Sequence, residues 1–297
     1  MSSQKKREAA YSPCPVCLST NAVRLYSKPR HDRTWHLARC SDCLQYYTDP
    51  LPTLDDIKSF YSDEYHADLT SEQGSEGEFG KKFRGYANWI LKHVPPGRSL
   101  DIGCTTGLFP HILKQRGFQA EGLEINTVTA QWGQQHYNIP IRNQPFETTT
   151  YDERSFRLIS MADVLEHSLN PAATLNRVHS ILEDDGFLFV SFPDIESVES
   201  RYLKALALAT HRDWLWMCCH IPLHTWEFTR PTAENMFRNA GFNITAFRRS
   251  HLNTFERSSP LLTMLFAPPL LLQVPPLGRK LGTQMEFILR KSNKPAD

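Results

Sequence analysis

From about residue 81 onward, the chain alternates short apolar runs with longer segments of helical periodicity. Apolar runs bounded by turn residues predict buried strands, and the segments between them predict helices. The expected strands are Ser99–Ile102, Ala120–Glu124, Phe156–Met161, Phe187–Phe192, Phe242–Phe247 and Met285–Leu289. The expected helices are Lys82–His93, Leu108–Arg116, Thr127–Tyr137, Pro171–Leu182 and Pro231–Asn239. This alternation favours an α/β fold with a doubly wound parallel sheet, in which ligands bind beyond the carboxyl ends of the strands.

The first of these strand ends reads LDIGCTTG, over Leu100–Gly107. Gly103 and Gly107 allow a tight turn and a close approach of ligand to backbone. The spacing matches neither G-x-G-x-x-G nor a P-loop ending in G-K-[ST], which argues against a dinucleotide or a P-loop nucleotide. Asp101 would repel a phosphate and suit an amine-bearing ligand. Glu124 ends the second strand, where a carboxylate can accept hydrogen bonds from ribose hydroxyls; capping of the next helix is the structural alternative.

These residues resemble the cofactor loop and ribose acid of the class I S-adenosylmethionine-dependent methyltransferases, whose loop usually reads D-x-G-x-G-x-G. Thr105 stands where the family has its middle glycine. The resemblance implies S-adenosylmethionine as cofactor and a Rossmann-like seven-stranded sheet with an antiparallel last strand. The implied cofactor contacts are Asp101, Gly103, Cys104 and Gly107 for the methionine moiety, Glu124 for the ribose, and Ile125 for the adenine. We expect a further adenine contact from Pro145–Glu147.

The segment MADVLEHSLNP, Met161–Pro171, follows the FRLISM strand. It resembles the D-V-L-E-H-x-x-x-P segment of small-molecule methyltransferases related to the ubiquinone-pathway enzymes. The resemblance implies that Asp163 and Val164 lie beside the sulfonium and adenosine, and that Glu166 and His167 face the substrate pocket. His167 can act as a general base if its pKa lies near the operating pH; the alternative is a structural pair that fixes the loop. Some relatives hold a divalent metal with acids and the histidine of this loop, so Asp163, Glu166 and His167 are a candidate metal site.

Histidine and tryptophan are concentrated in DWLWMCCHIPLHTWEF, over Asp213–Phe228. This stretch resembles the family's P-x-H-x-x-x-F-[ST] segment, which leads into a helix ending in A-G-F. In the class I fold this region often caps the acceptor pocket, so His220 and His224 are alternative bases to His167. The structural alternative is plain packing, because tryptophan is more often a core residue than a ligand contact.

Four of the seven cysteines form two C-x-x-C pairs, Cys14/Cys17 and Cys40/Cys43. Two such pairs are typical of a tetrahedral zinc site, and four thiolates leave no open position, so we expect a structural rather than catalytic metal. The following residues, LQYYTDPLPTLDDIKSFYSDEY, resemble the segment that precedes the catalytic domain in many bacterial-type methyltransferases of this subgroup. There the segment belongs to a small zinc-binding domain. The remaining cysteines, Cys104, Cys218 and Cys219, are assigned to the loop and the core.

Lys and Arg number 33 against 32 Asp and Glu, a formal net charge of +1 that gives no electrostatic case for nucleic acid. Residues 1–12 are polar and basic with no apolar run after them, and the paired C-x-x-C motifs suit a reducing compartment, so we expect a cytoplasmic protein.

Ser258–Gly278 is rich in leucine and has no charged residue, but its five prolines argue against a straight membrane helix. We expect a packed cap or surface loop there, with an interfacial contact with membrane or lipid as the alternative.

Together these patterns predict a zinc ribbon over residues 11–50, a connecting helix (Leu54–Tyr65) and mobile linker within 51–80, and a methyltransferase domain over 81–291 with a cap insertion around 195–230. The predicted activity is methyl transfer from S-adenosylmethionine to an oxygen or carbon of a small molecule, such as a sugar, a phenol or quinone, or a lipid precursor. An NAD-type oxidoreductase is disfavoured by the missing third glycine. The remaining alternatives are a zinc-ribbon protein that modifies RNA or protein, and an inactive cofactor-binding module.

Overall fold

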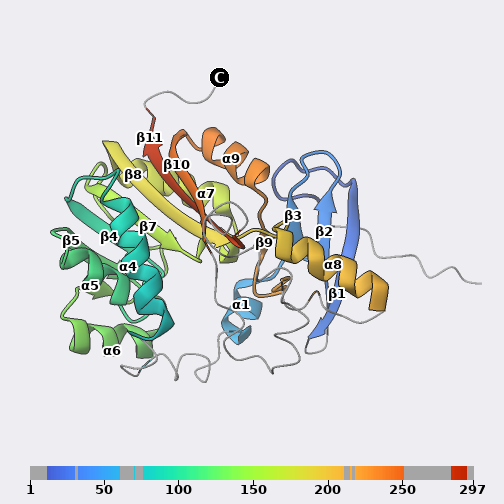
Figure 1. Cartoon of the computed structure of the whole chain (residues 1–297), viewed down its shortest axis with the longest axis horizontal. Coiled ribbons are helices and arrows are strands. Elements are labelled where there is room, and N and C mark those ends of the chain that lie inside the picture. The colour runs from blue at the N-terminus through green and yellow to red at the C-terminus, as the bar shows by residue number, and fades with distance from the viewer. Residues whose placement is uncertain are drawn as a thin grey trace, which may run out of the picture.

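The computed structural model describes residues 12–30, 33–60, 70, 76–210, 215, 218–250 and 282–292. Its larger sheet has seven strands in the order β10-β11-β8-β7-β4-β5-β6 (Figure 1). These strands are β4 (Arg98–Ile102), β5 (Gln119–Leu123), β6 (Ile141–Arg142), β7 (Phe156–Ala162), β8 (Leu182–Pro193), β10 (Phe242–Ser250) and β11 (Gln284–Lys291). The four pairs from β8 to β6 are parallel, and β11 is antiparallel to both of its neighbours. The expected Rossmann-like sheet and its antiparallel last strand are therefore confirmed.

Helices cover both faces of this sheet (Figure 1). They are α4 (Glu78–Ile90), α5 (Leu108–Lys114), α6 (Thr127–Tyr137), α7 (Pro171–Ile181) and α9 (Arg230–Asn239). Because successive strand residues point to opposite faces, Phe189 of β8 packs under α4 and α5, whereas Phe192 packs toward Phe237 of α9. Asn170 caps α7 by accepting from the backbone N–H of Ala173.

The structure differs from the predicted elements in several places. Helix α4 begins at Glu78, inside the expected linker, and α1 spans Leu54–Phe60. Strand β6 and helix α8 (Val198–Thr210) were not predicted; β6 has only two residues, too few for a periodic pattern. The segment 258–278 lies outside the described residues, so its expected packing or lipid contact stays a prediction. Over the described ranges, the structure contains no helix that is both long and apolar enough to cross a bilayer.

A second, four-stranded antiparallel sheet has the order β1-β2-β3-β9. Its strands are β1 (Ala22–Arg30), β2 (Arg33–Cys40), β3 (Tyr46–Asp49) and β9 (Trp226–Glu227). The first three come from the predicted ribbon, and β9 comes from the predicted cap. The ribbon and the cap thus share one sheet, which lies beside the large sheet and next to α8 (Figure 1).

Candidate functional site

The loop between β4 and α5 lies directly against the segment after β7. Gly103 has φ +71°, and a Cβ added there would lie 2.5 Å from Cγ2 of Val164. Both the backbone conformation and the neighbour therefore require glycine. Thr105 takes a left-handed φ of 51° in place of the family's middle glycine, and its hydroxyl lies 3.5 Å from the carbonyl oxygen of Gly103. The two loops predicted to bind the cofactor are in contact.

Asp101 is a buried carboxylate at the end of β4. Its Oδ1 accepts a hydrogen bond of 2.5 Å from the hydroxyl of Ser160 on β7. Burial raises the pKa of Asp101 to about 7; the Ser160 bond opposes this shift and the nearby charge of Glu124 adds to it. Its hydrogen-bond partner is a hydroxyl rather than a cation, so an ammonium group bound here would stabilise the charged form.

Glu124 holds the cofactor loop to the end of β5. Its Oε2 accepts from the N–H of Thr105 at 2.9 Å and its Oε1 from the N–H of Asn126 at 2.8 Å. Asn126, not Glu124, caps α6 with its side chain, which removes the capping alternative. A ribose role is compatible with these bonds because a carboxylate accepts up to about four hydrogen bonds. The next residue, Ile125, is 59% exposed, and its expected adenine contact stays a prediction.

Asp163 is held by residues that the sequence analysis did not assign to the site. Its carboxylate accepts hydrogen bonds from Lys82 on α4 and Gln284 on β11, and from the hydroxyl of Ser191 at 3.3 Å. These partners lie far from Asp163 in the chain, so no local motif could have indicated them. The second adenine contact was expected from Pro145–Glu147. Phe146 of this segment packs in the hydrophobic core, and the adenine contact stays a prediction.

The three candidate bases form one cluster. The rings of His167 and His224 are 4.8 Å apart between centroids, although the residues come from η1 (Leu165–His167) and from the segment before β9. The Nδ1 of His167 lies 2.9 Å from the carbonyl oxygen of Leu223, and the Nδ1 of His224 lies 3.1 Å from Oε1 of Glu227. The carbonyl oxygen of Leu223 can only accept, so Nδ1 of His167 carries the proton and its Nε2 is the basic nitrogen. An ionised Glu227 selects the same tautomer of His224.

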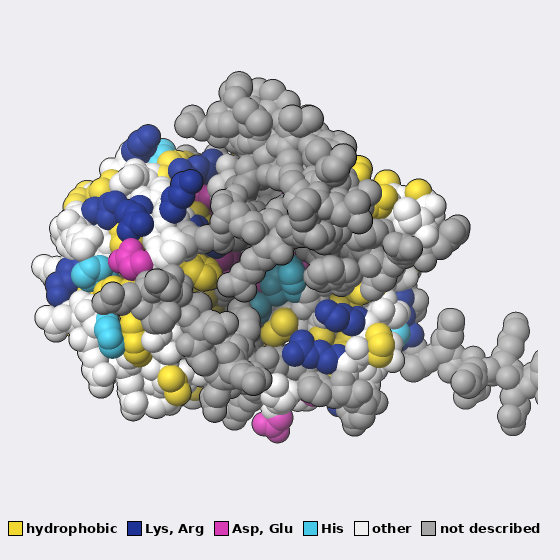
Figure 2. Space-filling model, turned by 60° about the horizontal axis from the view of Figure 1, so that its bottom comes forward, with side chains coloured by type: hydrophobic (Ala, Val, Ile, Leu, Met, Phe, Trp, Pro, Cys, Tyr) yellow, Lys and Arg dark blue, Asp and Glu magenta, His cyan; other side chains and the backbone are white. Residues whose placement is uncertain are grey.

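His220 is the third candidate, and its ring lies 4.9 Å from that of His224. It is exposed, whereas His224 is buried. Figure 2 shows a group of histidine side chains at the centre of one face of the molecule, with lysine and arginine side chains nearby. The three histidines thus extend from the interior to the surface.

Burial sets the charge state of this cluster. Desolvation lowers the pKa of His167 and of His224 to about 4, and raises that of Glu227 to about 7. Glu166 is 1% exposed, and neither of its carboxyl oxygens has a hydrogen-bond partner among the described residues. Its burial raises its pKa well above the usual range. At neutral pH the two imidazoles are therefore uncharged, but a pKa of about 4 lies below the operating pH that the sequence analysis required of a general base, so each is a weaker base than a free imidazole.

The cluster also contains a set of possible metal ligands. Glu166, His167 and His224 each place a ligand atom within 4.8 Å of the others. Asp163, which the sequence analysis grouped with Glu166 and His167, does not belong to this set, because Lys82 and Gln284 hold its carboxylate. His224 from the cap takes the place expected for Asp163.

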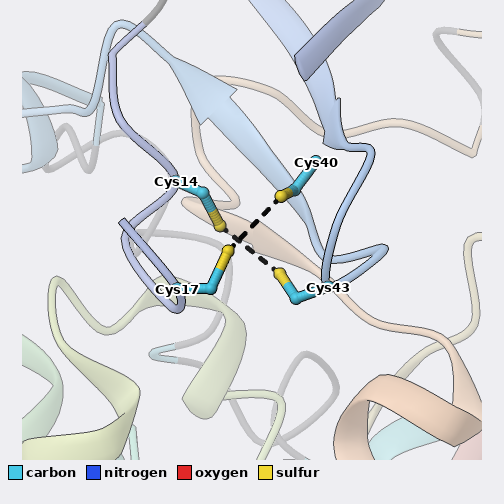
Figure 3. A group of neighbouring side chains, drawn as sticks. All are labelled: Cys14, Cys17, Cys40 and Cys43. Carbon is cyan, nitrogen blue, oxygen red and sulfur yellow. Dashed lines mark hydrogen bonds between the residues drawn. The ribbon is translucent and has the colours of Figure 1, made fainter. Parts of the chain in front are cut away.

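The four cysteines of the C-x-x-C pairs converge (Figure 3). The Sγ atoms of Cys14 and Cys43 are 3.5 Å apart, as are those of Cys17 and Cys40, and all four lie within 4.8 Å of one another. Figure 3 shows the sulfur atoms pointing toward a common centre. This is a candidate metal centre of the expected composition.

The chain has the architecture of class I methyltransferases: a doubly wound seven-stranded sheet, with Asp101 at the end of β4 and Glu124 after β5. The chain belongs to the methyltransferase domain family, whose model matches residues 76–246. Over 105 residues it is 30% identical to a ubiquinone biosynthesis O-methyltransferase of Coxiella burnetii, a stretch that covers 34% of this chain and 43% of that relative. The chain therefore matches less than half the length of this relative.

Solved structures share the fold at low sequence identity. The plantazolicin methyltransferase BpumL, in complex with S-adenosylhomocysteine, is 13% identical with a TM-score of 0.52, covering 80% of this chain and 94% of that one. A SAM-dependent methyltransferase from Archaeoglobus fulgidus is 14% identical with a TM-score of 0.50, covering 74% and 97%. The magnesium protoporphyrin IX methyltransferase of Synechocystis PCC 6803 is 14% identical with a TM-score of 0.50, covering 72% and 84%.

Proposed function

We propose that the protein transfers a methyl group from S-adenosylmethionine to an oxygen or carbon atom of a small-molecule acceptor. The observation that carries this proposal is a pair of neighbouring imidazoles beside the cofactor loop. Partly buried His167 follows the Asp163–Val164 segment that contacts this loop, and buried His224 lies against His167. A small-molecule acceptor is supported by the similarity to a ubiquinone biosynthesis O-methyltransferase. The fold is also shared with a protein named as a magnesium protoporphyrin IX methyltransferase.

The cofactor would bind across the carboxyl ends of β4, β5 and β7. Asp101 would pair with its ammonium group and Glu124 with its ribose, while Ile125 would pack on the adenine. The backbone of Gly103–Gly107 would approach the methionine moiety, and Asp163 and Val164 would lie beside the sulfonium. The sulfonium supplies an activated methyl group, so the protein's own task is to align the acceptor and remove its proton.

That proton would go to Nε2 of His167 or His224 as the acceptor atom takes the methyl group. Each imidazole is oriented by the bond from its Nδ1, to the carbonyl oxygen of Leu223 or to the carboxylate of Glu227. Such a bond fixes the tautomer that leaves Nε2 basic. His220 is the more exposed candidate and would act nearer the entrance.

We infer that Cys14, Cys17, Cys40 and Cys43 hold a structural zinc ion. Four thiolates form a closed tetrahedral shell with no position for a substrate, so the metal would stabilise the ribbon and take no part in the chemistry. Metal analysis would then give about one zinc per chain. A second equivalent of divalent metal, lost in the His224→Ala variant, would assign a further ion to Glu166, His167 and His224.

Calorimetry with S-adenosylhomocysteine and with NAD tests the cofactor: we expect binding of the first and none of the second. A screen of sugar, phenol and lipid-precursor acceptors with methyl-labelled S-adenosylmethionine then tests the acceptor class. Tight, salt-sensitive retention of RNA in a filter-binding assay would instead support an RNA-modifying enzyme and overturn the small-molecule proposal.

A further inference from the structure

The segment that carries His224 and Glu227 is bound to the four-cysteine unit by backbone pairing. Strand β9 pairs with β3, with Tyr46 opposite Glu227 and Tyr47 opposite Trp226. The pairing continues beyond β9, because the N–H of Thr48 donates to the carbonyl oxygen of Thr225 at 2.9 Å. The ribbon therefore contacts this segment at successive residues.

Two ribbon side chains reinforce the pairing. The hydroxyl of Thr48 donates to the carbonyl oxygen of His224 at 2.6 Å, and the Nε2 of Gln45 donates to the carbonyl oxygen of Glu227 at 3.0 Å. Thr48 is fully buried and Gln45 is 2% exposed. Because water cannot replace these donors at a buried site, both bonds hold the backbone of the His224–Glu227 dyad in place.

The same ribbon residues are tied to the cysteines. Gln45 follows Cys43 by two residues, and its carbonyl oxygen accepts from the N–H of Cys40 at 3.0 Å. The turn that places Cys40 and Cys43 therefore also fixes the start of β3. A metal ion on the four thiols would hold this turn, and through Gln45 and Thr48 it would hold the backbone of His224.

The cofactor loop is held by different residues. The hydrogen bonds described above for Asp101 and Glu124 come from Ser160, Thr105 and Asn126, all of the large sheet and its loops. The ribbon is thus bonded to the acceptor side of the site, by which we mean His224 and Glu227. The large sheet holds the cofactor side, by which we mean the loop after β4 with Asp101 and Glu124.

We propose that the four-cysteine unit is a positioning element for the acceptor side: through Gln45 and Thr48 it fixes His224 and Glu227, and loss of its metal releases them while the cofactor loop keeps its structure. Gln45 and Thr48 act as positioning residues. This inference rests on the proposed function only in assigning His224 to the acceptor side.

Diethyl pyrocarbonate, which modifies accessible neutral imidazoles, provides a test that needs no acceptor. The full chain is treated with the reagent before and after removal of metal by a chelator, and the modification rate of each histidine is measured by peptide mass spectrometry. The Cys17→Ser variant is treated in the same way without the chelator, because it loses only the four-cysteine metal and keeps any ion held by Glu166, His167 and His224. We expect the rate at His224 to rise at least about tenfold on metal removal and to return after zinc is added back. His136, on the opposite side of the large sheet in α6, serves as the control and should not change. The affinity for S-adenosylhomocysteine should stay within about twofold.

A matched pair of variants separates positioning from overall stability. Thr48→Val keeps the side-chain shape and removes the hydroxyl, so the rate at His224 should rise about threefold or more with unchanged metal content. Thr48→Ser keeps the hydroxyl and should behave as the parent. A rate at His224 that is unchanged after metal removal, or equal in Thr48→Val and the parent, overturns the proposal, as does loss of S-adenosylhomocysteine binding together with the metal. A parent that fails to bind S-adenosylhomocysteine overturns the proposed function instead, whatever the labelling of His224.

Discussion

Lowering the pH from 7.0 to 5.5 should weaken the binding of S-adenosylhomocysteine markedly, because Asp101 becomes protonated in the free protein. Burial raises the pKa of this carboxyl to about 7, and its hydrogen-bond partner is the hydroxyl of Ser160. Only the ionised carboxylate pairs with the ligand's ammonium group. The ammonium itself stays protonated below pH 7, so the pH dependence reports Asp101.

The size of this pH effect follows from the fraction of free protein in which Asp101 is ionised. With a pKa of about 7 for Asp101, the apparent Kd exceeds its limiting value about 2-fold at pH 7.0 and about 30-fold at pH 5.5. The expected loss between these pH values is therefore about 15-fold, or about 1.6 kcal/mol. Binding should also release protons, which calorimetry in buffers of different ionisation enthalpy measures directly.

Two variants sharpen this prediction. Asp101→Asn should bind weakly at both pH values and lose the pH dependence, whereas Asp152→Asn, which removes an exposed carboxylate, should behave as the parent. Ser160→Ala removes a bond that lowers the pKa of Asp101, so the midpoint should move to higher pH. An affinity that stays constant from pH 5.5 to 7.0, or a dependence that persists in Asp101→Asn, would refute the assigned role.

Three further perturbations have defined outcomes. Glu124→Ala should weaken S-adenosylhomocysteine binding at least about tenfold in calorimetry, because a charged hydrogen-bond acceptor for the ribose is lost; unchanged affinity would contradict the ribose role. The parent should contain about one zinc per chain by elemental analysis, and Cys14→Ser should lose the metal and unfold at lower urea concentration; a metal-free parent would rule out the ribbon site. Between pH 7 and pH 5 the free energy of unfolding should fall by about 2 kcal/mol for each of His167 and His224, since their folded pKa of about 4 lies below the unfolded value and the unfolded chain binds protons first. The raised pKa values of Asp101 and Glu227 act in the opposite direction, so urea titrations at the two pH values are compared between the parent and the His167→Gln and His224→Gln variants. A change in stability with pH that is the same in the parent and in both variants would show that the histidines are not held uncharged in the folded protein.

Local patterns predicted the large sheet and its helices closely. Helix Thr127–Tyr137 has the predicted bounds, and α7 begins at Pro171 as expected, because hydrophobic periodicity and helix start signals are short-range properties of the chain. The cofactor loop was recognisable for the same reason: Asp101, Gly103 and Gly107 lie within one strand-turn-helix unit, and Glu124 follows the next strand.

Contacts between distant segments were not predictable in this way. The pairing of Lys82 with Asp163 and of Thr48 with His224 depends on how the chain folds back on itself. His167 and His224 were each identified as a candidate base, but nothing in their local sequence places the two rings together. For the same reason the possible metal ligands beside Glu166 and His167 differ from those expected: the structure has His224 there instead of Asp163. Tertiary packing decides which side chains meet.

The pairing of β3 with β9 also affects whether the N-terminal residues can be removed without disturbing the rest of the chain. Gln45 and Glu227 are 182 residues apart in sequence, so the small sheet is completed only after most of the large sheet has been synthesised. Closing such a long loop is slow and entropically costly, which makes this pairing a late folding event. A cut at residue 81 would expose the edge of β9 and leave Trp226 without its partner Tyr47. Truncation of the first 80 residues should therefore give an aggregation-prone fragment rather than an independent methyltransferase domain.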